Sequence, residues 1–289
     1  MSPRRFRLGS REVSRTGYGA MQLTGPGIFG PPSDHDEAVR VLRSAVEHGI
    51  DHIDTAQYYG PDVVNDLIRQ ALHPYSGDLA IVSKVGAKRG PRGEIFLYNQ
   101  PDELRIGIED NVRSLGVDRL AAVNLRMPDS TASPDALFDD QLASLIQARA
   151  DGLIEGIGLS NISLAHFERA TAGTDIVCVQ NSLNLLERGS IDILDATAAK
   201  GVAFVPFCPL GFPRTQREQI LTDPTVLSVA EGIGATPVQI ALAWLLHLSP
   251  NVLLIPGTSS VGHLVENLAA ADVVLDAQSR SRLDAVGKP

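Results

Sequence analysis

Three polar residues in the first third of the chain have the types and spacing for proton transfer. Asp54 ends the apolar run of "DHIDTAQYYG", Tyr59 follows it by five residues, and Lys84 lies in "LAIVSKVG". A phenol with a reference pKa of about 10 is a poor acid at neutral pH, but a neighbouring ammonium makes it a better proton donor. A buried lysine keeps its charge only where a carboxylate holds it. The set could therefore protonate a carbonyl oxygen while a hydride arrives at the carbonyl carbon.

The same residues also fit a purely structural interpretation, a buried ion pair of Asp54 with Lys84 beside a packing tyrosine. Spacing alone favours this structural interpretation. Tyr58 is a competing proton donor, which we expect to face the wall of the fold. The choice between these interpretations depends on the elements that position the residues.

Apolar runs typical of strands alternate along the chain with helical patterns. The runs cover residues 16–23, 50–54, 79–86, 119–126, 154–161, 175–181, 202–211 and 251–258. The helical patterns cover residues 34–49, 62–72, 101–116, part of 134–151, 163–173, 191–201, 225–234, 237–248 and 262–272. Strands that are apolar throughout predict a parallel sheet covered on both faces. Eight such units without a break in composition predict an α/β fold, a closed (β/α)8 TIM barrel that forms a single domain over residues 1–289.

In such a barrel, chemistry occurs at the C-terminal ends of the strands and on the loops that follow them. The polar residues at those ends are Asp54, Lys84, Arg126, Ser160 with Asn161, Gln180 and Thr258. They come from six strands, yet the barrel would direct them to one mouth. The longest irregular stretches, 87–100 and 207–222, are expected to be loops after the third and seventh strands. The basic segment "GAKRGPRG" (86–93) is expected to be a solvated loop, with ligand phosphate binding as the alternative.

Composition excludes several classes of function. The 289 residues are 44% hydrophobic and 20% charged, with a formal net charge of −9, which argues against nucleic-acid and anionic-membrane partners. No apolar run approaches the roughly 20 residues of a membrane span, and no signal-peptide pattern opens the chain. Two cysteines and seven scattered histidines predict a reducing cytoplasm and no metal site.

The segment "GPGIFG" (25–30) satisfies the dinucleotide pattern GxGxxG but lacks its context. Pro26 removes a backbone donor, and no helix opens at the third glycine. We therefore expect a turn-rich loop here, and any nicotinamide nucleotide would bind without a Rossmann fold.

The motifs resemble those of the aldo-keto reductases over essentially the whole chain. "DTAQYYG" and "SKVG" are similar to the family's catalytic segments, which implies catalytic roles for Asp54, Tyr59 and Lys84. "GLSN", "VQN", "PFCPLG" and "IPGTSSVGHLVENL" resemble the segments that hold a nicotinamide cofactor. The resemblance implies cofactor contacts at Gly19, Ala20, Met21, Asp54, Ser160, Asn161, Gln180, Phe207, Cys208, Pro209, Leu210, Gly211, Gly257, Thr258, Ser259, Ser260, His263, Glu266 and Asn267.

Two positions depart from the family pattern. The family usually has a histidine in "LHxPD", whereas "LRMPD" (125–129) has Arg126, a permanently charged fork donor. Arg126 could polarise a carbonyl or pair with an anionic substrate group, or it could fill a structural salt bridge. His263 lies where an arginine commonly binds the 2′-phosphate of NADPH. Hydroxyls and helix N-terminal N–H groups can bind a phosphate, so NADPH is the expected cofactor and NADH remains possible.

Within the family, "GYGAMQLTGPGIFGPP", "VNLRMPD" and "IPGTSSVGHL" resemble the bacterial pyridoxal reductase branch. This resemblance implies NADPH-dependent reduction of pyridoxal to pyridoxine, with the pyridoxal 3-oxygen as an anionic partner for Arg126. Two alternatives stay open: a reductase of another aldehyde or ketone, and a non-catalytic NADPH-binding sensor or partner subunit. We expect a monomer or a small homo-oligomer.

Overall fold

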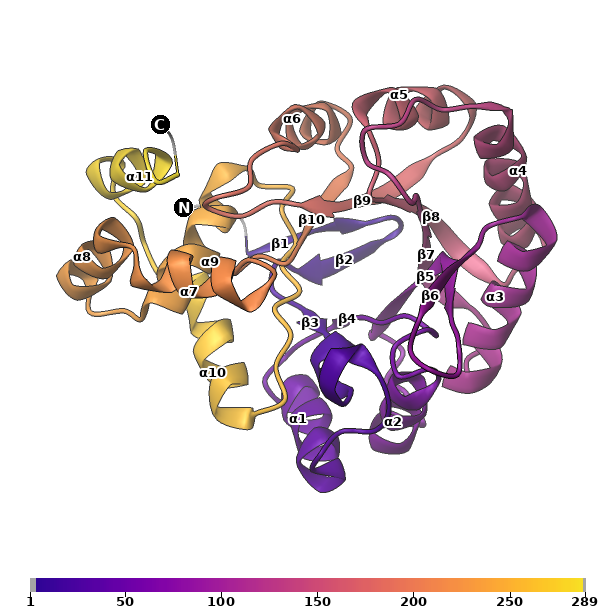
Figure 1. Ribbon diagram of the computed structural model, residues 1–289, viewed down its shortest axis with the longest axis horizontal. Coiled ribbons are helices and arrows are strands. Elements are labelled where there is room, and N and C mark those ends of the chain that lie inside the picture. Colours follow the sequence, from indigo (N-terminus) through magenta and orange to yellow (C-terminus); the bar gives the residue numbers. More distant parts are fainter. Residues whose placement is uncertain (1–3, 288–289) are drawn as a thin grey trace.

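A ring of parallel strands enclosed by helices forms the centre of the computed structural model, which describes residues 4–287 (Figure 1). The neighbouring strands in the ring are, in order, β10, β9, β8, β7, β5, β4 and β3, and each pair is parallel. Their bounds are β3 Tyr18–Gly19, β4 His52–Asp54, β5 Ala80–Arg89, β7 Leu120–Arg126, β8 Ile154–Ser160, β9 Ile176–Ser182 and β10 Ala203–Phe207.

An extended segment at residues 251–255 closes the ring between β10 and the residues that immediately precede β3. The Leu253 N–H donates to the Phe204 carbonyl at 2.8 Å, and the Gly17 N–H donates to the Leu254 carbonyl at 2.8 Å. The segment forms single bridges rather than a ladder. It leaves the sheet at Pro256, which has no N–H to donate. The predicted eighth strand is therefore shorter than 251–258, but the (β/α)8 barrel is confirmed.

Helices cover the outside of the ring (Figure 1). Asp34 caps the first of them by accepting the Glu37 N–H at 2.8 Å, while Pro101 begins the third and Gly116 ends it at a φ of +67°. The bounds are α1 His35–Glu47, α2 Val63–Leu72, α3 Pro101–Leu115, α4 Ala136–Ala150, α5 Leu164–Gly173, α6 Ile191–Ala199, α8 Pro224–Ile233, α9 Pro237–Leu248 and α10 Val261–Ala269.

An N-terminal hairpin, β1 Arg5–Leu8 with β2 Arg11–Ser14, lies across the ring in Figure 1. Leu8 and Val13 are buried and pack in one cluster with Ala80 and Ala203, the first residues of β5 and β10. The hairpin thus closes the N-terminal end of the barrel with apolar side chains. It was not predicted from the sequence, because both strands are short and carry arginines.

The two predicted long loops contain regular structure. Residues 87–100 form a hairpin in which β5 continues to Arg89 and pairs antiparallel with β6 Ile95–Tyr98. Residues 207–222 include α7 Arg214–Thr222, whose single buried residue is Ile220. A helix that buries so little has almost no apolar stripe, which explains why its pattern was missed. The last helix among the described residues is α11 Ala277–Asp284.

The first predicted strand, 16–23, is also corrected. Only Tyr18–Gly19 is strand, and Ala20–Leu23 forms a 3₁₀ turn (η1). Residues 25–30 form the expected turn-rich loop around the 3₁₀ turn η2 Pro26–Ile28, closed by a bond from the Gly25 N–H to the Gly30 carbonyl at 3.0 Å. A third 3₁₀ turn, η3, covers Ala270–Asp272.

Across residues 4–287 we find no single helix that is long and apolar enough to cross a membrane. Helices α8 and α9 meet the length and composition test only as a pair bent by 92°.

Candidate active site

The inward positions at the strand ends form a continuous polar row. Arg126, Ser160 and Gln180 are register partners on β7, β8 and β9, so their side chains leave the sheet side by side. Asp54 is the last residue of β4, and Lys84 lies two residues beyond its register partner Val82 on β5. The barrel thereby brings together residues that the sequence separates by more than a hundred positions.

Asp54 and Lys84 form the predicted ion pair, and both are buried, with exposed fractions of 4% and 5%. The Lys84 ammonium donates to Asp54 Oδ1 and to the Thr55 carbonyl, the latter at 3.0 Å. Gln180 Nε2 donates to Asp54 Oδ2 at 2.8 Å. Both carboxylate oxygens are therefore bound, which offsets the cost of burying the charge.

Tyr59 lies beside this ion pair. Its ring centroid is 5.0 Å from the Lys84 ammonium nitrogen and 5.3 Å from the ring of Tyr58. Both tyrosines are buried and line the same cavity. The prediction that Tyr58 faces the wall is therefore wrong.

Burial raises the pKa of Tyr59 well above 10, and the nearby Asp54 carboxylate raises it further. The guanidinium groups of Arg126 and Arg89 act in the opposite direction on this pKa. The sequence predicts that the Lys84 ammonium lowers this pKa, but burial outweighs that effect because the phenolate loses its hydration. Tyr59 consequently carries its proton at neutral pH, as a proton donor must.

A cavity of about 420 Å³ opens above these residues and extends to α10. The following predicted site residues line it: Gly19, Met21, Asp54, Tyr59, Lys84, Arg126, Ser160, Gln180, Phe207, Cys208, Pro209, Leu210, Gly211, Gly257, Thr258, Ser259, His263, Glu266 and Asn267. Amide, hydroxyl and aromatic groups thus line one space that reaches from Tyr59 to α10, and this set of groups fits a nicotinamide dinucleotide.

Comparisons with known proteins agree with this geometry. The model of the aldo/keto reductase family matches residues 15–288. The chain belongs to the aldo/keto reductase family. Pyridoxine 4-dehydrogenase of Escherichia coli strain K12 is 47% identical over 290 residues, with 100% of each chain covered.

Two solved aldo-keto reductases share the fold. One is thermostable and crystallised with the inhibitor epalrestat; it superposes with a TM-score of 0.82 and 31% identity over 98% of this chain and 99% of its own. The other, from Klebsiella pneumoniae, was crystallised with NADPH and gives a TM-score of 0.83 at 24% identity, covering 100% and 97% of the two chains. As a member of this family, the chain is a nicotinamide-dependent oxidoreductase that acts on carbonyl or alcohol groups.

Arg126 distinguishes this aldo-keto reductase from the usual family pattern. Its side chain is half-buried and lines the cavity with Tyr59. Within residues 4–287 its guanidinium group forms no ion pair with a carboxylate. The structural salt bridge considered from the sequence is therefore not what holds Arg126, and its charge faces the cavity.

Three predicted cofactor residues do not line this cavity. Ala20 is fully buried, and Ser260 lies just before α10, where its N–H donates to Thr258 Oγ1 at 3.2 Å. Asn161 lines a neighbouring hollow of about 440 Å³, and its Nδ2 donates to the Met127 carbonyl at 2.9 Å. Contacts of these three with the cofactor stay predictions, as do those of the predicted residues that line the cavity.

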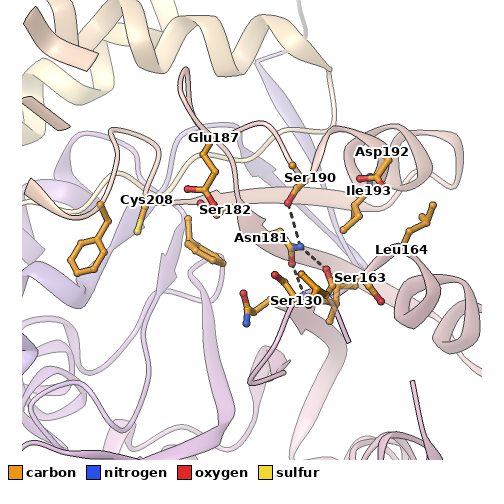
Figure 2. Close-up of a pocket in the computed structure, with 16 residues that line it drawn as sticks. Ser130, Ser163, Leu164, Asn181, Ser182, Glu187, Ser190, Asp192, Ile193 and Cys208 are labelled. Carbon is orange, nitrogen blue, oxygen red and sulfur yellow. Dashed lines mark hydrogen bonds between the residues drawn. The ribbon is translucent and has the colours of Figure 1, made fainter. Parts of the chain in front are cut away.

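Figure 2 shows the residues that line this neighbouring hollow, with Asn181 in the middle of the view and Ser163, Ser190, Glu187 and Asp192 around it. Asn181 Oδ1 accepts the Ile162 N–H at 3.0 Å and fixes the loop after β8. Cys208 lies on the wall between the two spaces. Burial raises the pKa of its thiol to about 11, so Cys208 is a weak nucleophile at neutral pH.

Arg89 is the main site residue that the sequence reasoning missed. It lies in the segment predicted to be a solvated loop, yet it is 9% exposed and lines the cavity. It donates to the carbonyls of Gly93 at 2.7 Å and Tyr58 at 3.2 Å, tying the β5–β6 hairpin to the tyrosine turn. The run "IFLY" after a Gly-Pro-Arg-Gly turn was a hairpin signal that could have placed it. Gln22, Ile28, Ile95, Phe212, Arg217, Val238, Ile255 and Pro256 also line the cavity.

Proposed function

We propose that this aldo-keto reductase reduces pyridoxal to pyridoxine with NADPH, using Tyr59 as the proton donor. The observation that carries the proposal is the guanidinium group of Arg126, which lines the cavity beside Tyr59 and forms no ion pair with a carboxylate among residues 4–287. The full-length identity of 47% to a pyridoxine 4-dehydrogenase supports the same substrate.

The chain's own residues would do the following. Ser160 and Gln180 hold the nicotinamide carboxamide, and the Phe207 ring packs on the nicotinamide. Gln180 has its amide oxygen left for this contact, because its Nε2 is bonded to Asp54. The cofactor supplies a hydride at the nicotinamide. Tyr59 donates its proton to the carbonyl oxygen, and the Lys84 ammonium, kept charged by Asp54, stabilises the phenolate that forms.

Arg126 would bind the 3-oxygen of pyridoxal. This oxygen is anionic when ionised and lies next to the aldehyde on the ring, so a guanidinium beside Tyr59 would orient the carbonyl towards the proton donor. A ligand that lacks the oxygen leaves a cation in the cavity without a partner. Arg126 would therefore discriminate between ring aldehydes rather than transfer the proton itself.

The preference for NADPH rests on the backbone and hydroxyl donors at the start of α10. Thr258, Ser259 and Ser260 precede this helix, and its N-terminus favours a phosphate. Two backbone donors are already used there, because the Ser260 N–H donates to Thr258 Oγ1 and the Val261 N–H donates to Glu37 Oε1, each at 3.2 Å. NADPH use therefore depends on the remaining donors, and NADH is the alternative cofactor.

The deciding experiment follows NADPH absorbance with pyridoxal in the wild type and in Tyr59→Phe. We expect oxidation that requires pyridoxal and falls by about 10²–10⁴ in the variant. A second pair of substrates, 3-hydroxypyridine-4-carboxaldehyde and pyridine-4-carboxaldehyde, differs only in the 3-oxygen. We expect Arg126→His to impair turnover of the 3-hydroxy aldehyde more than that of the aldehyde without this oxygen. Equal effects on both substrates would remove the role of Arg126.

Other outcomes select the alternatives. Tyr59-dependent turnover of other aldehydes without pyridoxal turnover would keep the mechanism and replace the substrate. Tight NADPH binding without turnover of any carbonyl would favour the sensor or partner subunit.

A further inference from the structure

A fully buried polar network lies behind the ion pair, between the sheet and helices α2 and α3. Thr55 Oγ1 donates to Asn65 Oδ1 at 2.9 Å, and Ser83 Oγ donates to Asn111 Oδ1 at 2.6 Å. Asn65 Nδ2 joins the two halves by donating to Asn111 Oδ1 at 3.0 Å. The side chains of all four residues are 0% exposed.

The network holds the immediate chain neighbours of the ion pair. Thr55 follows Asp54, and Ser83 precedes Lys84. Side-chain alternation therefore directs Asp54 and Lys84 into the barrel, and Thr55 and Ser83 towards the helices. The Thr55 carbonyl also accepts a bond from the Lys84 ammonium at 3.0 Å. A rotation of the Thr55 peptide would therefore move one of the two acceptors that orient Lys84.

Helix packing alone does not require these groups. On α3, Leu104 and Ile108 are fully buried and hold the helix against the sheet with apolar contacts. Buried amides and hydroxyls cost stability unless every group is paired, whereas a paired network fixes one arrangement of its members. The remaining donors are paired too, since Asn65 Nδ2 reaches Ser114 Oγ at 3.0 Å and Asn111 Nδ2 reaches the Gly107 carbonyl at 2.8 Å.

We propose that Thr55, Asn65, Ser83 and Asn111 are positioning residues that fix the Lys84 ammonium relative to Tyr59 from outside the barrel. This inference rests on the proposed role of Lys84 in proton delivery. The four residues touch neither substrate nor cofactor. They act by holding the two strand ends at one separation and one rotation.

The test compares Thr55→Val with Thr197→Val in the full chain. Thr197 is a matched control, because it is also 0% exposed and its Oγ1 accepts a bond from an asparagine, Asn251 Nδ2, at 3.1 Å. Asn251 lies at the start of the closing segment, at the end of the barrel away from the mouth. Both variants remove one buried hydroxyl and keep the shape of the side chain.

The measurements are kcat and KM for an aldehyde that the wild type reduces, KM for NADPH, and the thermal midpoint. We expect Thr55→Val to lower kcat by about 10- to 100-fold and to leave KM for NADPH unchanged. Thr197→Val should lower the thermal midpoint by as much as Thr55→Val does, but should keep the wild-type kcat. Thr55→Ser, which keeps the hydroxyl, should restore kcat. Ser83→Ala is a smaller change and should also lower kcat. It takes the place of Thr55→Val in the test if that variant does not fold.

Equal kcat values in Thr55→Val, Ser83→Ala and Thr197→Val would overturn the positioning role and leave the proposed function intact. A wild-type protein that reduces no aldehyde would overturn the proposed function and the positioning role with it. The two failures are therefore distinguishable in one set of assays.

Discussion

The two ends of the barrel are built from the same strands but filled in opposite ways. At the N-terminal end, Leu8 and Val13 of the hairpin pack against the small first residues of β5 and β10. At the C-terminal end, the inward positions carry Lys84 and Arg126 beneath a cavity of about 420 Å³. The difference between the ends comes from the types of residue that each strand places at its two ends.

This difference separates stability from chemistry. The closed end buries apolar surface and needs no specific polar partner, whereas each polar group buried at the mouth needs one. Asp54 has two side-chain donors from two other strands, and Lys84 has two acceptors. Substitutions at the two ends should therefore fail in different assays.

The largest effect should follow from Lys84→Met at the mouth. We expect reductase kcat to fall by about 10²–10⁴, because the phenolate of Tyr59 loses its cation. Stability should also fall, by about 3–5 kcal/mol, since Asp54 is left as a buried carboxylate without its main partner. Steady-state rates and a denaturant titration measure the two effects.

The double variant Asp54→Leu with Lys84→Met is the control for this prediction. It removes both charges, so it should recover stability but not activity. Recovery of activity would show that the ion pair has a structural role only, which is the structural interpretation of these residues in the sequence.

At the closed end, Leu8→Ala should have the reverse profile. Leu8 is 3% exposed, and its truncation should cost about 2–5 kcal/mol of unfolding free energy. The kcat should stay at the wild-type value, because the mouth and its hydrogen bonds are unchanged. Val274→Ala, at a side chain that is 70% exposed, is the matched control and should change stability by less than about 0.5 kcal/mol. A large loss of kcat in Leu8→Ala at temperatures where it is folded would contradict the separation.

The barrel itself could be predicted from the sequence because its signals are local. Apolar runs and helical stripes repeat along the chain, and alternation placed Asp54 and Lys84 at neighbouring strand ends. The closing hairpin was missed because β1 and β2 are four residues each, and only Leu8 and Val13 of them are buried. Such a short pattern is not distinguishable from a polar terminus.

The contacts of the site were harder to predict than its members. Gln180 was expected at the nicotinamide, but its bond to Asp54 depends on how far β4 and β9 approach across the barrel. The pKa of Tyr59 depends on burial, which no single segment specifies. Arg89 belongs to a basic stretch that is typical of a solvated loop, and only the hairpin turns it inward.

The pH profile should distinguish the mouth from the closed end through Tyr59. Burial raises the pKa of Tyr59 well above 10, so the proposed proton donor stays protonated up to at least about pH 10. The kcat/KM for an aldehyde that does not itself titrate should therefore show no loss from Tyr59 ionisation below that pH. Because the pKa is raised in the folded state, its contribution to stability is complete below about pH 10 and falls as pH rises through the folded value.

The assignment would be contradicted if kcat/KM of the wild type fell with rising pH below pH 9 and the residual activity of Tyr59→Phe showed no such fall. Leu8→Ala should keep the wild-type profile, since no titrating group lies at the substituted position.

The smallest effect concerns the rim of the mouth, where Glu37 accepts the Val261 N–H at the start of α10. Hydrogen bonds from Arg40 and from that N–H lower the pKa of Glu37, so it is anionic at neutral pH and opposes a phosphate at this helix N-terminus. We expect Glu37→Gln to lower KM for NADPH by about threefold and to leave KM for NADH unchanged. Asp36→Asn is the control, because this carboxylate lies in the same helical turn with a side chain that is 88% exposed. If both variants change the two KM values equally, the effect is one of net charge, and the 2′-phosphate does not bind at the start of α10.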